Sequence, residues 1–493
     1  MPGRSRDLAL GVTAPTSLPD VSEAAVGFRS ERGPVLIALM VSTGLIAVDA
    51  TILATAVPSI VKDLGGFASF PWLFSVYLLA QAVSVPVYAK LADTVGRKPL
   101  MLLGIALFLA GSVLCGFAWS MPALIAFRAV QGLGAGAVQP MAITIAGDIY
   151  SVAERARVQG YIASVWGISS VVGPALGGLF SQLDAWRWIF FVNVPLTVLA
   201  ALLILRNFHE QIEKRRHQID YAGAVLLMAS MTLLILGVLE GGQAWAWSSP
   251  VSMAVFAAGA VLLGAFVLVE RRAAEPVLPL WVLSRRLLLT TSLLALGVGA
   301  VLIGLSSYVP TYLEGAIGSP PLVAGLALAS LTIGWPIAAA FSGKLFYLRY
   351  GFKPTVLIGM GFILAGIALL TARAYAPDVA VVAVGCFVMG LGLGLVASPS
   401  LIAAQASVEW DQRGVVTGAN MFARSIGSAV GVAIFGAVAN GIIARGGGPT
   451  VPTAVRDGAA AVFWAVLIAS VVTTVIALFM PKVQADVGPA ASS

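Results

Sequence analysis

The sequence predicts an all-α polytopic membrane protein with about 14 transmembrane helices, built as two parallel six-helix repeats plus two extra central helices. Its 493 residues are 59% hydrophobic and 10% charged, with a mean hydropathy of +0.96, a composition that excludes an ordinary soluble domain. Apolar runs of about 20 residues recur along the chain, and a charged turn between two such runs occurs twice, half a chain apart. Because lipid offers no partners to backbone polar groups, each run is expected to be a helix.

The apolar runs set the order of the predicted spans. The polar tail, 1–33, has no apolar core of the kind that signal peptides contain, so we expect a cytoplasmic tail there. The segment 482–493 is expected to be its C-terminal counterpart. Between them the spans are predicted to begin near Pro34, Pro71, Leu100, Pro122, Val158, Arg187, Ile219, Val251, Leu287, Pro321, Pro354, Pro377, Val415 and Ala459.

The distribution of lysine and arginine predicts the orientation. With the N-terminus in the cytoplasm, 22 of the 29 basic residues fall on the cytoplasmic side and five on the outer side. The other two, Arg128 and Arg424, lie inside spans. We therefore expect a multi-pass protein of the cytoplasmic membrane with both termini inside. Arginine outnumbers lysine, and alanine, glycine and valine are abundant, which favours a bacterial source.

The charged turn reveals an internal repeat. The first copy, AKLADTVGRKP, runs from Ala89 to Pro99, and a weaker copy, GKLFYLRYGFKP, runs from Gly343 to Pro354. Glycines of later spans align at a nearly constant offset, although chance alignment of glycine-rich helices is an alternative. The predicted halves are 34–206 and 287–481, with two extra helices in 219–271. Inserting an even number of spans preserves orientation, so the repeats are parallel.

Asp49 and Arg128 are the first candidate functional residues. Asp49 lies roughly 22 Å into the first span, where a charged carboxylate costs about 2.5–3.5 kcal/mol. This cost favours reversible protonation, and we expect a proton-coupling or cation-binding acid that faces a central cavity. A water-exposed acid near the helix end is the alternative. Arg128, in the fourth span, is expected to pair with a carboxylate or with backbone carbonyls. If it lines the same cavity as Asp49, it could tune that acid or form a proton path with Gln131; a purely structural salt bridge is equally compatible.

The first charged turn predicts a cytoplasmic latch. Asp93 lies near a helix end and Arg97 follows four residues later, within pairing distance. Lys98 is the third charged member of this predicted latch, and Gly96 lies in the same turn. The second copy has Phe346 and Tyr347 near the place of the acid, so we expect the latch to be strong in the first half and weak in the second.

The fifth span contains residues that favour close helix packing. Gly173 and Gly177 form a small-residue face, and Pro174 favours a kink. Gly427 and Gly431 give the thirteenth span an equivalent face, so we expect the two halves to pack and rock along this seam. Arg424 stands where the fifth span has Trp166 and is a candidate partner for Asp93.

Polar and aromatic residues within the spans are candidates for a substrate cavity. Polar side chains in lipid-embedded helices usually face protein or water, although packing or interface positions are the alternative for most of them. The candidates are Tyr77, Gln81, Gln139, Trp166, Asn193, Tyr308, Tyr312, Glu314 and Asn420.

The sequence shows no pattern typical of a disulfide, a nucleotide-binding loop, a metal site or a catalytic centre. Cys115 and Cys386 lie in apolar runs of opposite halves and are expected to be core residues rather than a disulfide. No phosphate-binding GxxxxGK[ST] motif, metal-ligand cluster or nucleophile–base pair occurs, so we expect neither an enzyme nor a cofactor. The basic charge belongs to membrane loops and does not indicate nucleic-acid binding.

Five segments together resemble the major facilitator superfamily, in particular its fourteen-span drug/proton antiporter branch. They are VDATILATAVP (Val48–Pro58), the turn AKLADTVGRKP, LIAFRAVQGLGAGA (Leu124–Ala137), GISSVVGPALGGL (Gly167–Leu179) and WRWIFFVNVP (Trp186–Pro195). Ala89 stands where the family's turn begins with glycine. The segment at Gly167 is similar to the signature of antiporters.

The resemblance implies proton-coupled efflux of hydrophobic or amphipathic small molecules, such as drugs or antibiotics, by alternating access. Its expected partners are the substrate, protons and the lipid bilayer, with the proton gradient in place of a cofactor, and we expect a monomer. A flippase or exporter of lipids or lipophilic metabolites and a proton-coupled nutrient importer are the alternatives.

Overall fold

The computed structural model describes residues 26–65, 72–210, 220–242, 245–273, 276, 279, 281–376, 378–447 and 451–483. Within these residues, 14 helices are long and apolar enough to cross a membrane, which confirms the predicted fold class and number of spans. Three predicted starts, Pro71, Ile219 and Pro377, lie outside the described residues.

Seven helices make up the first half of the chain. The short helix α6 and helix α7 together form the sixth span. The helices are α1 (Gly33–Leu64), α2 (Trp72–Val95), α3 (Arg97–Gly116), α4 (Met121–Ile149), α5 (Val152–Gln182), α6 (Trp188–Phe191) and α7 (Asn193–Asn207).

The two central spans are α8 (Tyr221–Glu240) and α9 (Pro250–Glu270). The short helix α10 (Trp281–Ser284) leads into the second half, where a π-helical turn, η2, and a 3-10 turn, η3, precede later helices. These elements are α11 (Arg286–Ile317), α12 (Pro321–Ser342), η2 (Gly343–Tyr347), α13 (Leu348–Tyr350), α14 (Phe352–Ala372), α15 (Val379–Ala406), η3 (Trp410–Gln412), α16 (Arg413–Arg445) and α17 (Pro452–Leu478).

Two helices begin well before the positions that hydropathy predicts. Helix α5 starts at Val152 rather than near Val158, because Ser151 and Glu154 form a capping box that satisfies the first backbone N–H groups. Helix α17 starts at Pro452 rather than near Ala459, with the proline in the first turn, where its missing N–H costs nothing. Hydropathy locates the lipid-embedded part of a helix, whereas caps locate its ends.

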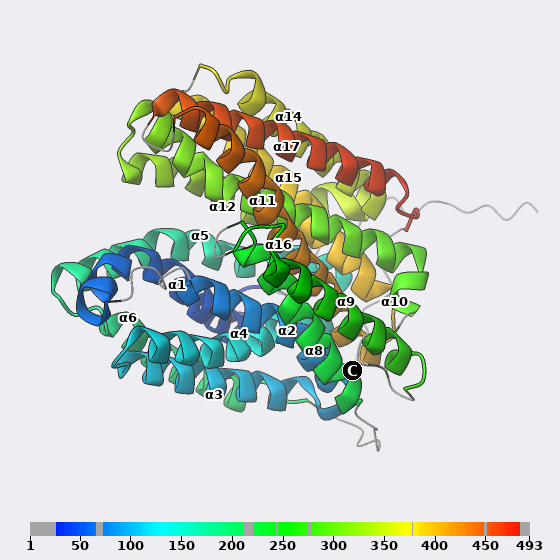
Figure 1. The fold of residues 1–493 in the computed structure, drawn as a ribbon. Helices are drawn as coiled ribbons and strands as arrows, with labels where there is room; N and C mark the ends of the chain where they lie inside the picture. The colour runs from blue at the N-terminus through cyan, green and yellow to red at the C-terminus, as the bar shows by residue number, and fades with distance from the viewer. Residues whose placement is uncertain are drawn as a thin grey trace, which may run out of the picture.

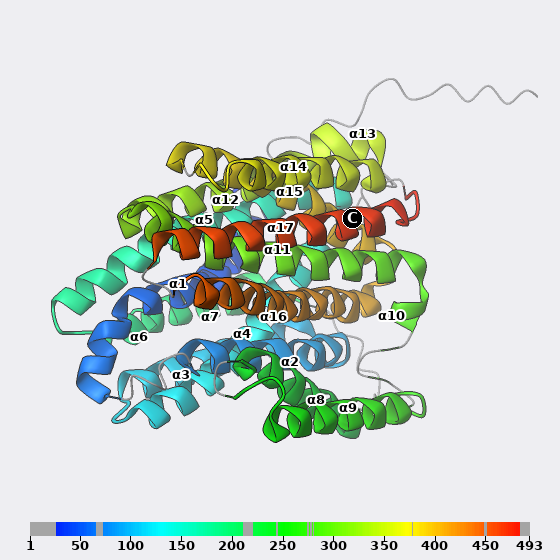
Figure 2. The ribbon, with the colours of Figure 1, turned by 45° about the horizontal axis from the view of Figure 1, so that its top comes forward.

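Corresponding helices pack alike in the two halves. Helix α1 packs on α5 and α3 on α4, as α11 packs on α16 and α14 on α15. The halves meet along two further pairs, α5 with α12 and α2 with α16. Figures 1 and 2 show the two central spans at one side, where α8 and α9 pack on each other and α8 lies against α2 and α16.

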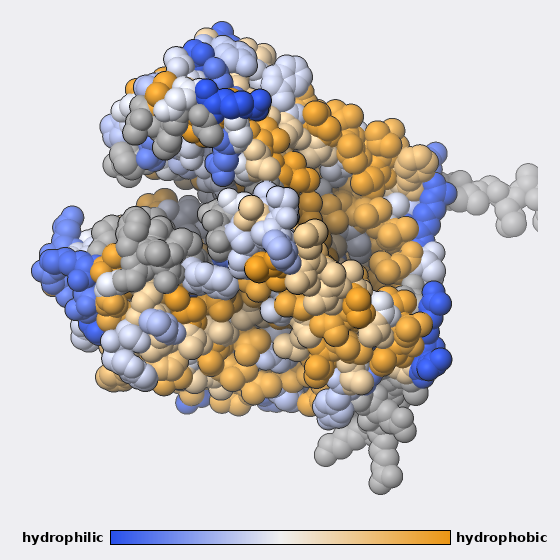
Figure 3. All heavy atoms as spheres, viewed as in Figure 1, coloured by the Kyte–Doolittle hydropathy of each residue, from blue (hydrophilic) through white to orange (hydrophobic). Residues whose placement is uncertain are grey.

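The surface separates into an apolar belt and two more polar ends. Figure 3 shows the belt across the molecule and, at the left, a hollow that divides an upper from a lower lobe. We call the end where α3 and α16 begin the basic end, because Arg97, Lys98 and Arg413 lie there. The hollow opens at the opposite end, so the two halves are apart at one end and in contact at the other.

Candidate functional site

Asp49 and Arg128 form a buried ion pair between α1 and α4. Arg128 Nη1 lies 2.6 Å from Asp49 Oδ2, and each side chain is 1% exposed. Two charges in so enclosed a place remain charged only with close mutual contact and further hydrogen bonds. Of the partners that the sequence left open for Arg128, a carboxylate or backbone carbonyls, the structure shows the carboxylate of Asp49.

Three more polar side chains complete the surroundings of Asp49. Gln131 Nε2 and Asn193 Nδ2 donate to Asp49 Oδ1 over 2.7 and 2.9 Å. Both amides also donate to the hydroxyl of Ser112, on α3. Asp49 thus accepts hydrogen bonds from three side chains: Arg128, Gln131 and Asn193. Ser112 was not predicted, since a lone serine in an apolar run gives no signal of its own.

Arg128 is held on its other side by α2. Its guanidinium carbon lies 4.2 Å from the centre of the Tyr77 ring, and its Nε donates to the backbone oxygen of Leu73. Tyr77 and Asn193 are therefore part of this buried cluster instead of facing a cavity between the halves. Asp49 does not face that cavity either, because α1, α3, α4 and α7 enclose it within the first half.

Asp93 joins the two halves at the basic end. Its carboxylate accepts hydrogen bonds from the backbone N–H groups of Gly414 and Val415, over 3.1 and 2.8 Å. These are among the first N–H groups of α16, which have no partner within the helix and carry its positive dipole end. Asp93 is also 2.8 Å from Arg97 Nη2, as predicted. A residue of one half thereby caps a helix of the other.

Arg97 connects the same region to further residues of both halves. It lies 3.1 Å from Asp148 Oδ2 and donates to the backbone oxygen of Trp410, whose ring centre is 3.7 Å from the guanidinium. Asp148 in turn lies 3.3 Å from Arg413 of α16. Sequence reasoning missed Asp148, although an acid at the end of an apolar span is a usable signal. We call Asp93, Arg97, Asp148 and Arg413 the latch.

The turn between α2 and α3 is shaped for this contact. Gly96 has a φ of 107°, a conformation that favours glycine. Glu210 caps α3 by accepting from the N–H groups of Arg97 and Lys98, both over 3.0 Å. The Nζ of Lys98 donates to the backbone oxygen of Leu205. Lys98 therefore supports the turn within the first half and, among the described residues, makes no bond to the second, so it is not part of the contact between the halves that the sequence predicts for it.

The second copy of the turn is asymmetric, as predicted, but it also bridges the halves. Tyr347 takes the place of Asp93, and its hydroxyl donates to the backbone oxygen of Val152, in the first turn of α5. A phenol cannot cap N–H groups as a carboxylate does, so this copy binds without charge. Lys353 repeats the contact of Lys98, donating to the backbone oxygen of Leu478.

An apolar cluster joins the two halves above the latch. It consists of one buried residue from each of α2, α4, α15 and α16: Val85, Ile143, Leu401 and Met421. We call it the plug. Gln81 and Gln139 lie one helical turn from Val85 and Ile143, toward the hollow, and Gln81 Nε2 donates to Gln139 Oε1 over 2.8 Å. A polar layer therefore lies directly on the plug, and these two predicted cavity residues are part of it.

Comparison with known proteins identifies the family. The family model described as Major Facilitator Superfamily matches residues 39–432. The chain belongs to the major facilitator superfamily. It is 36% identical over 406 residues to Multidrug resistance protein 3 of Bacillus subtilis, covering 82% of this chain and 79% of that protein. It is 33% identical over 414 residues to Multidrug transporter protein MdtP of the same bacterium, covering 84% and 76%.

These relatives place the chain in the multidrug efflux branch of the major facilitator superfamily, as its motifs predict, and make it a membrane transporter and not an enzyme. Solved structures agree on the fold. The human organic anion transporter MFSD10 superimposes with a TM-score of 0.65 at 16% identity, over 91% of this chain and 99% of that one. The proton:xylose symporter XylE gives 0.64 at 13% identity, over 92% and 96%.

The glycine faces that were expected between the halves of this superfamily member lie within each half instead. A Cβ atom on Gly173 would meet Thr51 Oγ1 of α1 at 2.0 Å. On Gly427, Cβ would meet the Leu296 backbone oxygen of α11. The predicted rocking seam is therefore wrong for these residues. Gly177 is also buried in α5, and Pro174 lies in the same helix, its side chain outside the described residues.

The contact of α5 with the other half uses a different face. A Cβ atom on Gly160 would lie 2.3 Å from Ala340 Cβ, and Ser170 Oγ is 3.5 Å from Thr332 Oγ1. Both partners belong to α12. A glycine at a helix crossing predicts the close approach of a second helix but does not identify that helix. The sequence therefore does not show whether the glycine faces of α5 and α16 pack within a half or between the halves.

The remaining cavity candidates have different surroundings. Tyr312 is buried in the core of the second half, where its hydroxyl donates to the backbone oxygen of Ala374. Asn420 donates to the Thr291 backbone oxygen, and Glu314 is exposed. Trp166 and Tyr308 are half-buried and pack against the cores of their own halves. Tyr312 therefore does not line a cavity.

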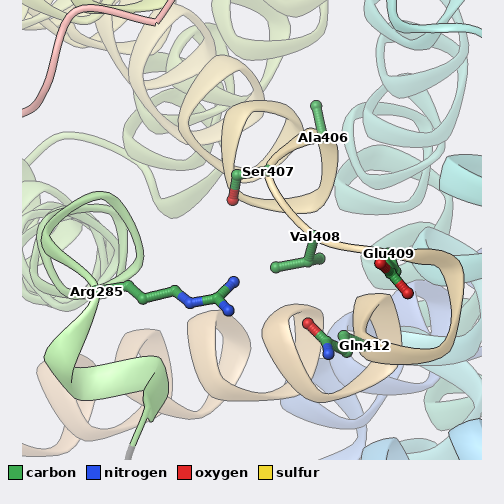
Figure 4. Close-up of a pocket in the computed structure, with 6 residues that line it drawn as sticks. All are labelled: Arg285, Ala406, Ser407, Val408, Glu409 and Gln412. Carbon is green, nitrogen blue, oxygen red and sulfur yellow. The ribbon is translucent and has the colours of Figure 1, made fainter.

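Two other polar sites lie at the ends of the molecule. Figure 4 shows a pocket at the basic end into which Arg285 extends; its lining residues are Arg285, Ala406, Ser407, Val408, Glu409 and Gln412. It belongs to the second half and lies below the plug. At the opposite end, hydrogen bonds from Arg187 and then Trp186 lower the pKa of Asp63. Cys115 and Cys386 are free and buried, as predicted.

Proposed function

We propose that this protein exports hydrophobic or amphipathic small molecules, such as drugs or antibiotics, from the bacterial cytoplasm in exchange for protons. The basic end is cytoplasmic in this proposal, with both termini inside, and the halves 34–206 and 287–481 are the bodies that move. The names of the bacterial relatives support drug efflux. A fungal relative, Efflux pump dotC of Dothistroma septosporum, is 31% identical over 404 residues, covering 81% of this chain and 70% of that protein.

The arrangement of the halves supports alternating access. The latch and the plug hold the halves together at the basic end, while the hollow lies at the opposite end. In the proposed cycle this is the outward-open state. A substrate bound above the plug leaves to the outside, and the latch then opens so that the next substrate enters from the cytoplasm.

The buried pair of Asp49 and Arg128 is the observation that carries the coupling proposal. Among the ion pairs of the described residues it lies farthest from the helix ends, and a charged pair there is stable only while both partners are present. A proton that enters from outside converts Asp49 to its neutral form, and Arg128 then loses its counter-ion. Helices α1 and α4 must adjust, which links protonation to the position of the whole half. No cofactor is required, since the proton gradient supplies the energy.

Export is tested by expressing the protein in a bacterial host that lacks its main efflux systems. We expect lower susceptibility to several lipophilic drugs, and accumulation of a fluorescent drug that rises when a protonophore is added. In everted vesicles, an imposed pH gradient with an acidic lumen should drive uptake of the same drug. Uptake that is unchanged without the gradient would reject proton coupling, and accumulation in the opposite direction would favour an importer.

A further inference from the structure

Arg424 is a cation near the middle of the membrane that the proposed cycle does not use. It lies 11 residues into α16 from Arg413, roughly 16 Å along the helix from the basic end. A charged arginine at such a depth costs about 2.5–3.5 kcal/mol even on the most lenient scale. A cation is kept there at this cost only if something compensates it at some stage.

No compensating group lies next to Arg424 in this state. Among the described residues it has no ion pair and no side-chain hydrogen bond, and Asp93, its predicted partner, is bound by Arg97 and by the start of α16. Of the described acids, only Asp49 lies far from a helix end, and Arg128 already neutralises it. The positive charge of Arg424 is therefore not balanced within the described part of the protein.

Arg424 is placed to meet a molecule in the hollow. It follows Met421 of the plug by three residues, on the same side of α16 and toward the hollow. It is therefore at the level of the hydrogen-bonded Gln81 and Gln139, which also lie one turn above the plug. The side chain of Arg424 is half-buried, whereas that of Arg128 is only 1% exposed.

The packing of α16 does not require this arginine. The helix is held against α11 by its backbone here: a Cβ atom on Gly299 would lie 2.1 Å from the Arg424 backbone oxygen, and Ser428 donates to the Gly299 oxygen. The equivalent position in α5 is Trp166, at the same offset of 258 residues that relates Gly160 to Gly418. The first half thus forms the corresponding helix without a cation.

We infer that Arg424 binds the acidic group of an amphipathic organic anion and thereby sets the substrate class of the transport site. A guanidinium forms paired hydrogen bonds with a carboxylate or sulfonate. The apolar residues of the plug contact the rest of the molecule, and Gln81 and Gln139 offer neutral polar contacts. This inference rests on the proposed export function for its transport consequence, but the binding site itself is testable without transport.

The test compares two xanthene dyes of similar size and opposite charge at neutral pH, the anion fluorescein and the cation rhodamine 6G. Fluorescence anisotropy measures their binding to the purified full-length protein in detergent. We expect Arg424→Gln to weaken fluorescein binding about ten- to hundredfold, as loss of a charged hydrogen-bonding partner does. Binding of rhodamine 6G should stay the same or improve, and Arg424→Lys should recover part of the fluorescein affinity.

Arg445→Gln is the matched control, because Arg445 lies at the exposed end of the same helix and, within the described part of the chain, bonds only to the Gly441 backbone oxygen. It should bind both dyes like the unmodified protein, and thermal unfolding verifies that each variant is folded. If Arg424→Gln weakens both dyes equally, or if the unmodified protein does not prefer the anion, the inference is wrong. A preserved charge preference without proton-driven transport in vesicles would instead reject the proposed function.

Discussion

Arg128 Nη1 and Asp49 Oδ2 are 2.6 Å apart, and neither side chain is more than 1% exposed. The two residues come from α1 and α4, so the contact fixes two helices of the first half to each other. Each charge depends on the other, because neither reaches water. Any event that neutralises Asp49 therefore changes how α1 and α4 are held, which is the physical basis of the proposed coupling.

Breaking this pair from one side is expected to be costly. Arg128→Gln leaves Asp49 as an uncompensated buried charge, and we expect a loss of about 3–5 kcal/mol in unfolding free energy. Asp49→Asn combined with Arg128→Gln removes both charges and should restore part of that loss. Thermal unfolding in detergent of the two single variants and the double variant measures the coupling. Strictly additive losses would mean that the pair is not energetically linked.

Disrupting the latch is expected to open the basic end. Asp93→Asn removes the charge that pairs with Arg97 and caps α16, so the closed state should lose about 1–3 kcal/mol. The readout is labelling of Val85→Cys in the plug by a water-soluble maleimide applied at the basic end, in a background without the native cysteines. We expect labelling at least several times faster in the Asp93→Asn background. Lys98→Gln is the control, since the bonds of Lys98 to described residues all lie within the first half.

The close approach of α5 to α1 makes Gly173 sensitive to substitution. Gly173→Ala places a Cβ atom 2.0 Å from Thr51 Oγ1, so one of the helices must shift, at a cost of about 1–3 kcal/mol. Gly178→Ala, in the same helix, meets nothing within 4 Å and should be neutral or slightly stabilising. Comparing their melting temperatures tests the packing. Equal melting temperatures would contradict the described contact.

The lowered pKa of Asp63, at the end opposite the latch, predicts a small pH dependence of the protein's stability. Arg187 and Trp186 lower its pKa, so its contribution to stability is complete above the ordinary aspartate pKa and is lost as the pH falls through the lowered value. Because the pair is exposed, we expect less than about 1 kcal/mol. The difference in melting temperature between the unmodified protein and Asp63→Asn should shrink as the pH is lowered toward 3. A difference that grows on acidification would contradict this assignment.

Much of the fold follows from the sequence because lipid restricts the choices. Apolar runs must be helices, the distribution of arginine and lysine predicts their orientation, and the repeated turn predicts the parallel halves. The contact of Asp93 with Arg97 also follows, since two residues four apart on a short turn can meet. The need of Arg128 for a buried partner follows from its place in a span, whereas the choice of Asp49 over backbone carbonyls does not.

Other contacts depend on the tertiary structure and were not accessible from the sequence. The capping of α16 by Asp93 joins residues more than 300 positions apart, and backbone N–H groups leave no trace in a sequence. The hydroxyl of Tyr347 bonds to α5, but in the sequence this residue cannot be distinguished from any other aromatic residue of an apolar run. The glycine faces were assigned to the wrong neighbour, since a small residue does not identify its partner. Tyr77 and Asn193 lie around Asp49 and not in the predicted cavity, because a polar side chain in a span needs a partner but does not identify it from the sequence.

The most direct measurement is proton movement through Asp49 in proteoliposomes. The protein is reconstituted with a pH-sensitive dye inside and an acidic lumen, and a transported drug is added outside. Proton-coupled exchange predicts that the drug makes the lumen less acidic while it accumulates there, and that folded Asp49→Asn protein shows neither response. Proton efflux and drug accumulation that persist in Asp49→Asn would contradict the assignment of coupling to this carboxylate.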